Sequence, residues 1–415
     1  MHSKHNANAN SETDTDKETG MVSIKEYSRA ALRAAHGVSL LTPMLSGLSS
    51  GTEMASYGKA QWDFLLRGGD VTAYLATGTT ATHVTTHATT PLGTNQGDQP
   101  PLLGCLLRVH LGEEGNTAEA LGGGSSSPAE AFGMMLVAPE ARGRGVARAL
   151  LERALGEGDA GARRLLAVCT PKGQPLYRRL GFSNAGGWVT ALRLDAAGEA
   201  AVPPGDDRSG NGNGGGSFRV RTLGSLDNDR GTDAPAIDPG VRSLLIDMDA
   251  RATGFDRSRR LSFVMGGGGP SEGKDRGSGA SAMVAMATPL GAFAADADTD
   301  TDTNGGREQP PAAAAIVRRE KAGGPCVIGP LWGDREAAVP VVRALVQSVR
   351  EGARRTGGSS VVSVLVKDHQ GLVDRLVEDV GFVEAARFPA MSLDGKPVYE
   401  GGDGTYLALM HPTLG

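Results

Sequence analysis

The sequence predicts two successive α/β (α+β) domains, each with a mixed, mostly antiparallel sheet flanked by helices. A strand, a glycine turn and an amphipathic helix follow one another between Ala131 and Gly156. A polar, Gly-rich segment at residues 195–217 has no apolar periodicity and reads as a linker. The second half repeats the element order of the first, and 415 residues are too many for one ordinary core.

The stretch from Ala131 to Gly156 contains the strongest local signal. The apolar run Phe132–Ala138 predicts a buried strand, which Pro139 ends. Apolar residues then recur at the spacing of an amphipathic helix: Ala147, Leu150, Leu151, Ala154 and Leu155. A strand therefore passes through a short turn directly into a helix.

The turn has the composition of a phosphate-binding site. Gly143 and Gly145 let the backbone approach a ligand closely. The first N–H groups of the helix lack intrahelical partners and lie at the positive end of its dipole. A P-loop is excluded because no Gly-Lys-Ser/Thr follows. A Rossmann turn is excluded because Arg148 replaces its third glycine and no acid follows the next strand.

Two motifs in this order resemble the GNAT superfamily of N-acetyltransferases. The Arg/Gln-x-x-Gly-x-Gly/Ala pattern of that family fits Arg142, Gly145 and Ala147. Downstream, the segment from Pro175 to Phe182 is similar to its second signature, Leu-Tyr-x-x-x-Gly-Phe. The alternative is a generic βα unit of an α/β domain.

The resemblance implies acetyl-CoA as co-substrate and a set of site residues. The turn would hold the pyrophosphate, and the backbone around Leu136 and Val137 would run beside the pantetheine. An N–H near Leu136 would serve the oxyanion. The residues implied to bind the coenzyme are Leu136, Val137, Arg142, Gly143, Arg144, Gly145, Val146, Ala147 and Gln174.

Tyr177 matches the tyrosine that protonates the departing thiolate in this family, and it is the predicted general acid. The alternative is that its ring merely packs against the coenzyme. No general base can be read. Glu140 is expected on the outer side of the loop, and for His110 and Asp63 a solvated surface side chain is the favoured interpretation. A chain of ordered water molecules is an alternative base.

The first domain is predicted over residues 23–194, after a disordered tail at 1–22. Its expected helices are Tyr27–Ala35, Ala60–Leu66, the helix after Gly145 and the one bearing Tyr177. Its expected strands are Val71–Ala76, Leu102–Leu111, Phe132–Ala138, Leu165–Thr170 and Gly187–Leu194.

The second domain, residues 218–415, is predicted as a divergent copy. Expected helices are Val241–Ala250, Arg335–Arg354 and Leu372–Val380, and expected strands are Ala282–Ala287, Ala312–Arg318, Cys326–Leu331, Val361–Val366 and Thr405–Met410. Its segment Ala252–Ser258 resembles the C-terminal domain of tandem acetyltransferases. Asp256 and Arg257 are expected to pair with each other inside the second domain, and the alternative is a pair with a substrate. At its turn, Asp334 and Glu336 would repel a pyrophosphate, so this copy is not expected to bind acetyl-CoA.

Composition narrows the possible partners. A net charge of -5 argues against a general nucleic-acid binder, and no apolar stretch is long enough to span a membrane. No metal is expected, because His83 and His87 have no third ligand nearby and Asp296–Thr303 lacks the glycine and distal Glu of a calcium loop. Three separated cysteines suit a reducing compartment, so a cytoplasmic location is expected, with the nucleus left open.

Two functions follow from these observations. The first is an N-acetyltransferase that moves an acetyl group to the primary amine of a small molecule or peptide. The alternative is a non-catalytic sensor that holds an acyl-CoA or another metabolite. The sequence determines neither the acceptor amine nor the oligomeric state.

Overall fold

The computed structural model describes both halves of the chain. The described residues are 22–28, 32, 41–46, 48, 62, 65–66, 71–78, 101–112, 129–156, 164–195, 218–226, 237–265, 281–289, 310–319, 324–367, 369–396 and 405–410. Residues 1–21 of the predicted tail, the linker after Asp195, Asp63, His83, His87 and Asp296–Thr303 lie outside them. Val22, which was expected to end the tail, instead begins a strand.

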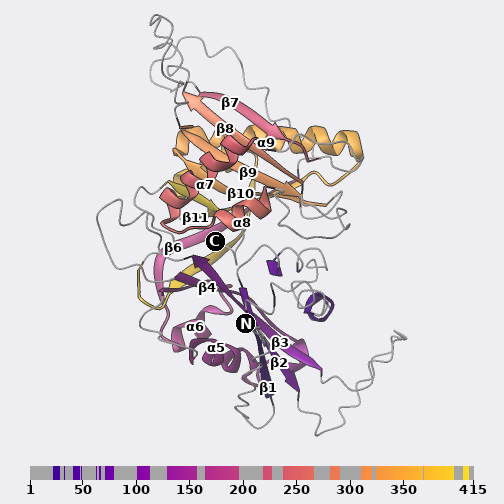
Figure 1. The fold of residues 1–415 in the computed structure, drawn as a ribbon, viewed down its shortest axis with the longest axis vertical. Coiled ribbons are helices and arrows are strands. Elements are labelled where there is room, and N and C mark those ends of the chain that lie inside the picture. The colour runs from indigo at the N-terminus through magenta and orange to yellow at the C-terminus, as the bar shows by residue number, and fades with distance from the viewer. Residues whose placement is uncertain are drawn as a thin grey trace, which may run out of the picture.

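A single 13-stranded sheet runs through the described residues of both halves, in the order β1-β2-β3-β4-β5-β12-β6-β11-β13-β10-β9-β8-β7. Figure 1 shows the first half below, the second half above and β6 between them. Most neighbouring strands in this sheet are antiparallel. In each half, one parallel pair breaks this pattern: β4 with β5, and β10 with β11.

The first half contains the strands β1 (Val22–Tyr27), β2 (Val71–Gly78), β3 (Leu102–Gly112), β4 (Ala129–Val137), β5 (Arg164–Val168) and β6 (Ser183–Asp195). Its helical elements include a 3-10 turn (Pro139–Ala141), α5 (Val146–Gly156) and α6 (Gln174–Arg179), and residues 41–46 are also helical. The apolar stripe of α5 forms as predicted, with Leu150 and Leu151 buried against the sheet.

The second half contains the strands β7 (Phe218–Gly224), β8 (Ser281–Pro289), β9 (Ala313–Arg319), β10 (Cys326–Gly333), β11 (Val361–Lys367), β12 (Val383–Ser392) and β13 (Tyr406–Leu409). Its helical elements are α7 (Pro239–Thr253), α8 (Ser258–Val264), α9 (Arg335–Thr356), α10 (Gln370–Arg375) and a π-helical turn (Leu376–Val380).

Alternate residues of β9 face two different cores. Ala313 and Ala315 pack in the core that includes α9, whereas Ala314 and Ile316 belong to the core that includes α7 and α8. This alternation follows from the two-residue period of a strand. Both faces of the upper sheet are therefore covered, as Figure 1 shows.

The two halves exchange strands at the centre of the sheet. The first-half strand β6 pairs with β11 from Val189↔Lys367 to Asp195↔Val361. The second-half strand β12 lies between β5 and β6 and pairs with β5 from Ala390↔Val168 to Ser392↔Leu166. Each half therefore supplies a strand that the sheet of the other half needs.

Most predicted elements are present, with bounds that shift by a few residues, but several were missed. Strands β1, β7 and β12 and helix α8 were not predicted, and Tyr27 ends a strand where a helix was expected to begin. The sequence of β12 does not predict a strand, because its first three residues are exposed and it contains Pro389. The domain boundaries at 23–194 and 218–415 remain predictions.

We predict that the two halves fold only together. If the chain is cut between residues 196 and 217, a fragment ending there keeps β6 but loses both of its partners, β11 and β12. The edge backbone and the buried Leu192 would then be exposed. Each fragment alone should aggregate or lack cooperative unfolding, and co-expressed fragments should elute as a 1:1 complex in size-exclusion chromatography with light scattering. A monomeric first fragment that unfolds cooperatively would contradict this prediction.

Candidate active site

Strand β4 contains a β-bulge just after its last residue paired with β5. Cys105 lies opposite Leu136 and Leu107 opposite Gly133, so Met134 and Met135 together face a single residue of β3. Met134 has a φ of 51°, which is uncommon for a residue other than glycine. The thiol of Cys105 donates to the Met134 carbonyl at 3.4 Å, so the bulge has its own internal support.

Beyond the bulge, β4 and β5 separate. Their parallel pairing runs from Ala129↔Arg164 to Phe132↔Ala167 and does not continue. Arg142 Nε donates to the Val137 carbonyl at 3.4 Å, whereas the Leu136 carbonyl faces β3, 2.8 Å from where a Cβ on Gly104 would lie. Alternate residues of a strand direct their backbone groups to opposite neighbours, so Val137 faces the gap and Leu136 does not. The backbone of Val137 is therefore better placed than that of Leu136 to pair with a pantetheine arm in the gap.

The predicted turn lies at the end of this gap. Gly143 has a φ of 75° and Gly145 of 82°, a conformation that glycine adopts without strain. Residues 142–145 are exposed, and a Cβ on either glycine would have no atom within 4 Å. Val146 is buried, Ala147 is half-buried, and the first turn of α5 contains no acidic residue. The start of α5 therefore lies in open, positively charged surroundings, where an anionic phosphate fits.

Tyr177 lies near the point where the strands part. It is buried on α6, and its ring packs edge-on against Phe182, with centroids 5.4 Å apart. Phe182 in turn packs against Phe132, the last β4 residue paired with β5, with centroids 6.1 Å apart. Burial raises the pKa of Tyr177, and the nearby Cys169 raises it further, so the phenol keeps its proton at neutral pH.

Gln174 begins α6, and its Nε2 donates to Asn184 Oδ1 at 3.0 Å. It is half-buried on the same short helix as Tyr177. The structure thus places Gln174 and Tyr177 after β5, and the remaining predicted residues on β4, on the turn and at the start of α5. Glu140 is exposed in the 3-10 turn, as expected.

The second half contributes directly to the surroundings of Tyr177. The Cys169 amide donates to the Pro389 carbonyl at 3.3 Å, and the Cys169 thiol donates to Met391 Sδ at 3.5 Å. Both partners lie on β12. Burial raises the pKa of Cys169 to about 11. Sequence reasoning missed this contact, because it joins positions 220 or more residues apart.

His110 is not the solvated side chain that the sequence suggested. It is half-buried, and its Nδ1 lies 2.7 Å from Glu130 Oε1, while Arg108 Nε lies 3.2 Å from Glu130 Oε2. Because β4 begins at Ala129, it includes a carboxylate that the predicted strand, starting at Phe132, left out. The three side chains form a largely buried polar cluster on one face of β3 and β4, in which the carboxylate of Glu130 is engaged.

A metal site and a membrane-spanning helix are both absent from the part of the chain that the structure describes. No group of three or more His, Cys, Asp or Glu side chains there is arranged to hold a metal ion. No helix there is both long and apolar enough to cross a bilayer.

One comparison with known proteins matches the segment that contains this site. Residues 108–184, which include the bulge, the turn and Tyr177, match the family model of the acetyltransferase (GNAT) domain. No curated protein matches the sequence. The residues of the candidate site therefore lie in a segment similar to a GNAT acetyltransferase domain.

Two solved structures have a similar fold over all or most of the chain. One is a candidate acetyltransferase from Pyrococcus horikoshii, with 12% identity and a TM-score of 0.52, covering 100% of each chain. The other is a tandem GNAT protein from the clavulanic acid biosynthesis pathway, solved without acetyl-CoA, with 12% identity and a TM-score of 0.51, covering 89% of this chain and 98% of that one. The protein therefore has the tandem GNAT fold, with a divergent second copy.

We predict that the thiols of Cys105 and Cys169 are unreactive in the folded protein. Burial raises the pKa of Cys105 to about 12 and that of Cys169 to about 11, from an ordinary value of 9.0. A raised pKa lowers the thiolate fraction at pH 8 about tenfold for each unit, and alkylation needs the thiolate. Iodoacetamide at pH 8 should leave both unmodified over hours, as read by peptide mass spectrometry, and should modify both in urea. Rapid labelling of either thiol under native conditions would contradict the burial.

Proposed function

We propose that the protein is an acetyl-CoA-dependent N-acetyltransferase whose reaction takes place in the first half. Its acceptor is the primary amine of a small molecule or peptide. The observation that carries this proposal is the gap between β4 and β5, which has the open glycine turn at its end and the protonated phenol of Tyr177 beside it. The GNAT domain match over these residues supports it.

The coenzyme's parts correspond to features along this gap. The amides and arginines of residues 142–147 would bind the pyrophosphate, by hydrogen bonds and by the helix dipole. The backbone of Val137 would pair with the pantetheine, and Arg142, which now donates to that carbonyl, would be available to a phosphate once it turned outward. The bound coenzyme supplies an activated acetyl thioester.

In this mechanism the acceptor nitrogen attacks the thioester carbonyl, and the C–S bond then breaks. Tyr177 donates its phenolic proton to the departing sulfur, because the phenol is protonated at neutral pH. We assign no side chain as base. Glu130, the carboxylate of β4, is engaged with His110 and Arg108, so the amine proton passes to water.

Gly145→Glu should abolish acetyl-CoA binding. The substitution puts a carboxylate into the open space above the helix amides, where it would repel the pyrophosphate and take its hydrogen bonds. We expect the affinity measured by calorimetry to fall by at least about 100-fold. Gly357→Glu is the matched control, because Gly357 also has a left-handed φ, of 69°, and open space around it, but caps the far end of α9. Equal affinity in the Gly145 variant would refute the turn assignment.

Tyr177→Phe should slow acetyl transfer while acetyl-CoA affinity stays within about threefold of wild type. Loss of a general acid costs about 10²–10⁴-fold in kcat. The ring still packs against Phe182, so the fold should be unaffected. Thiol release in a steady-state assay measures the rate, and Tyr27→Phe in β1 is the control. If kcat is unchanged, Tyr177 only packs against the coenzyme.

A panel of amines distinguishes the enzyme from the sensor. An enzyme releases free thiol from acetyl-CoA with at least one amine and gives an acetylated product by mass spectrometry. A sensor would bind acetyl-CoA by calorimetry and release thiol with none.

A further inference from the structure

The gap that is open in the first copy is filled in the second. The parallel strands β10 and β11 pair from Cys326↔Val362 to Ile328↔Val364 and then part, as β4 and β5 do. Beyond that point β13 lies between them: Leu331 pairs with Ala408 on one side, and Leu365 pairs with Leu409 on the other. We propose that β13, a strand of this chain, permanently occupies the coenzyme groove of the second copy, so that the protein binds one acetyl-CoA per chain.

The contacts of β13 leave no room for a second occupant. A Cβ on Gly329, at the irregular point of β10, would lie 2.1 Å from the Leu409 carbonyl oxygen. The Gly333 amide donates to the Thr405 carbonyl at 2.8 Å. The backbone of β13 thus makes the strand-like hydrogen bonds that a pantetheine arm would make in an open groove.

The anion site of the second copy is also taken. Residues 138–145 separate β4 from α5, but only Asp334 separates β10 from α9. The Asp334 carboxylate accepts from the amides of Glu336 at 2.7 Å and Ala337 at 3.1 Å. These are the helix-start amides that a phosphate would need, and a carboxylate of the chain already satisfies them. Glu336 adds a second negative charge in the first turn.

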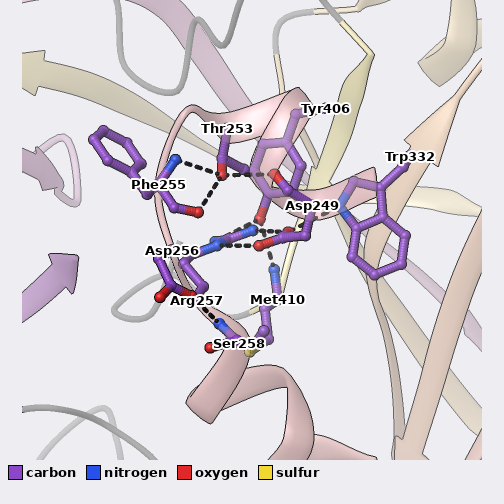
Figure 2. Close-up of polar contacts among 9 residues, drawn as sticks. All are labelled: Asp249, Thr253, Phe255, Asp256, Arg257, Ser258, Trp332, Tyr406 and Met410. Atoms are coloured by element: carbon purple, nitrogen blue, oxygen red, sulfur yellow. Dashed lines mark hydrogen bonds and ion pairs between the residues drawn. The ribbon is translucent and has the colours of Figure 1, made fainter. Parts of the chain in front are cut away.

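A buried network of side chains surrounds Tyr406, the first residue of β13, and Figure 2 shows its polar contacts. Arg257 Nη1 donates to the Tyr406 hydroxyl at 3.2 Å, and its guanidinium lies over the Tyr406 ring, 4.9 Å from the centroid. The same arginine forms a buried ion pair with Asp249, which also accepts from Trp332 Nε1 at 2.9 Å. Helix α7, the residue that precedes α8 and strand β10 thereby hold the first residue of β13.

This network also corrects the expected pair of Asp256 with Arg257. Arg257 pairs with Asp249, whereas Asp256 accepts from the amide of Ser258 at 3.0 Å, at the start of α8. Burial lowers the pKa of Arg257, but Asp249 and Tyr406 outweigh this, so the net shift is upward. The segment that resembles tandem acetyltransferases therefore anchors β13.

The inference rests on the proposed function only in naming acetyl-CoA as the probe. Calorimetry on the full chain should give one site per chain for wild type and for the Gly357→Glu control, and none for Gly145→Glu. Two sites in wild type would overturn it.

Hydrogen exchange read by mass spectrometry tests the occupant itself. The amides of residues 406–409 should exchange at least about 10³-fold more slowly than in an unstructured peptide, with or without acetyl-CoA. Fast exchange of these amides, or exchange that changes when acetyl-CoA is added to Gly145→Glu, would overturn the inference. If wild type binds no acetyl-CoA, the proposed function fails, and the exchange of β13 alone decides this inference.

Discussion

The parting of two parallel strands determines what each half of this protein can do. A strand that loses its neighbour exposes backbone N–H and C=O groups, which need new partners when they are buried. In the first copy β4 continues past its last pair with β5, and the Val137 carbonyl there accepts from the exposed Arg142. In the second copy β13 satisfies the edges of β10 and β11. The same strand geometry thus gives a candidate binding groove in one half and a closed sheet in the other.

Strand exchange explains why a copy without an open groove is still needed. Strand β6 occupies the side of β11 that faces away from β10, and β12 fills the corresponding place beside β5. Through Pro389 and Met391, β12 reaches Cys169, whose charge state bears on the pKa of Tyr177. The second half is therefore part of the wall around the proposed general acid, even though its own groove is filled.

Much of the first site could be predicted from the sequence because it is local. The glycine turn, the start of α5 and Tyr177 follow from residues close together in the chain, where spacing and glycine content are informative. The bulge at Met134 could not be predicted, because it depends on a register with β3 and on a thiol, Cys105, 29 residues away. β12 was missed for the same reason. Its place is set by β5 and β6, whose paired residues lie between 190 (Val383↔Arg193) and 226 (Ser392↔Leu166) positions earlier, and its own exposed start has no apolar alternation.

The buried ion pair of Arg257 and Asp249 bears more on specificity than on stability. Replacing a buried pair with apolar side chains is often neutral, whereas removing one partner costs about 3–5 kcal/mol because the other charge is left uncompensated. Such a pair restricts which strand can lie beside it. The guanidinium donates to the Tyr406 hydroxyl, which in turn accepts from the Met410 amide at 3.4 Å, and Arg318 Nη2 binds the Met410 carbonyl at 3.2 Å. A slip of β13 by one residue would turn Tyr406 to the opposite face and break these contacts, so the network sets the register of the strand that fills the groove.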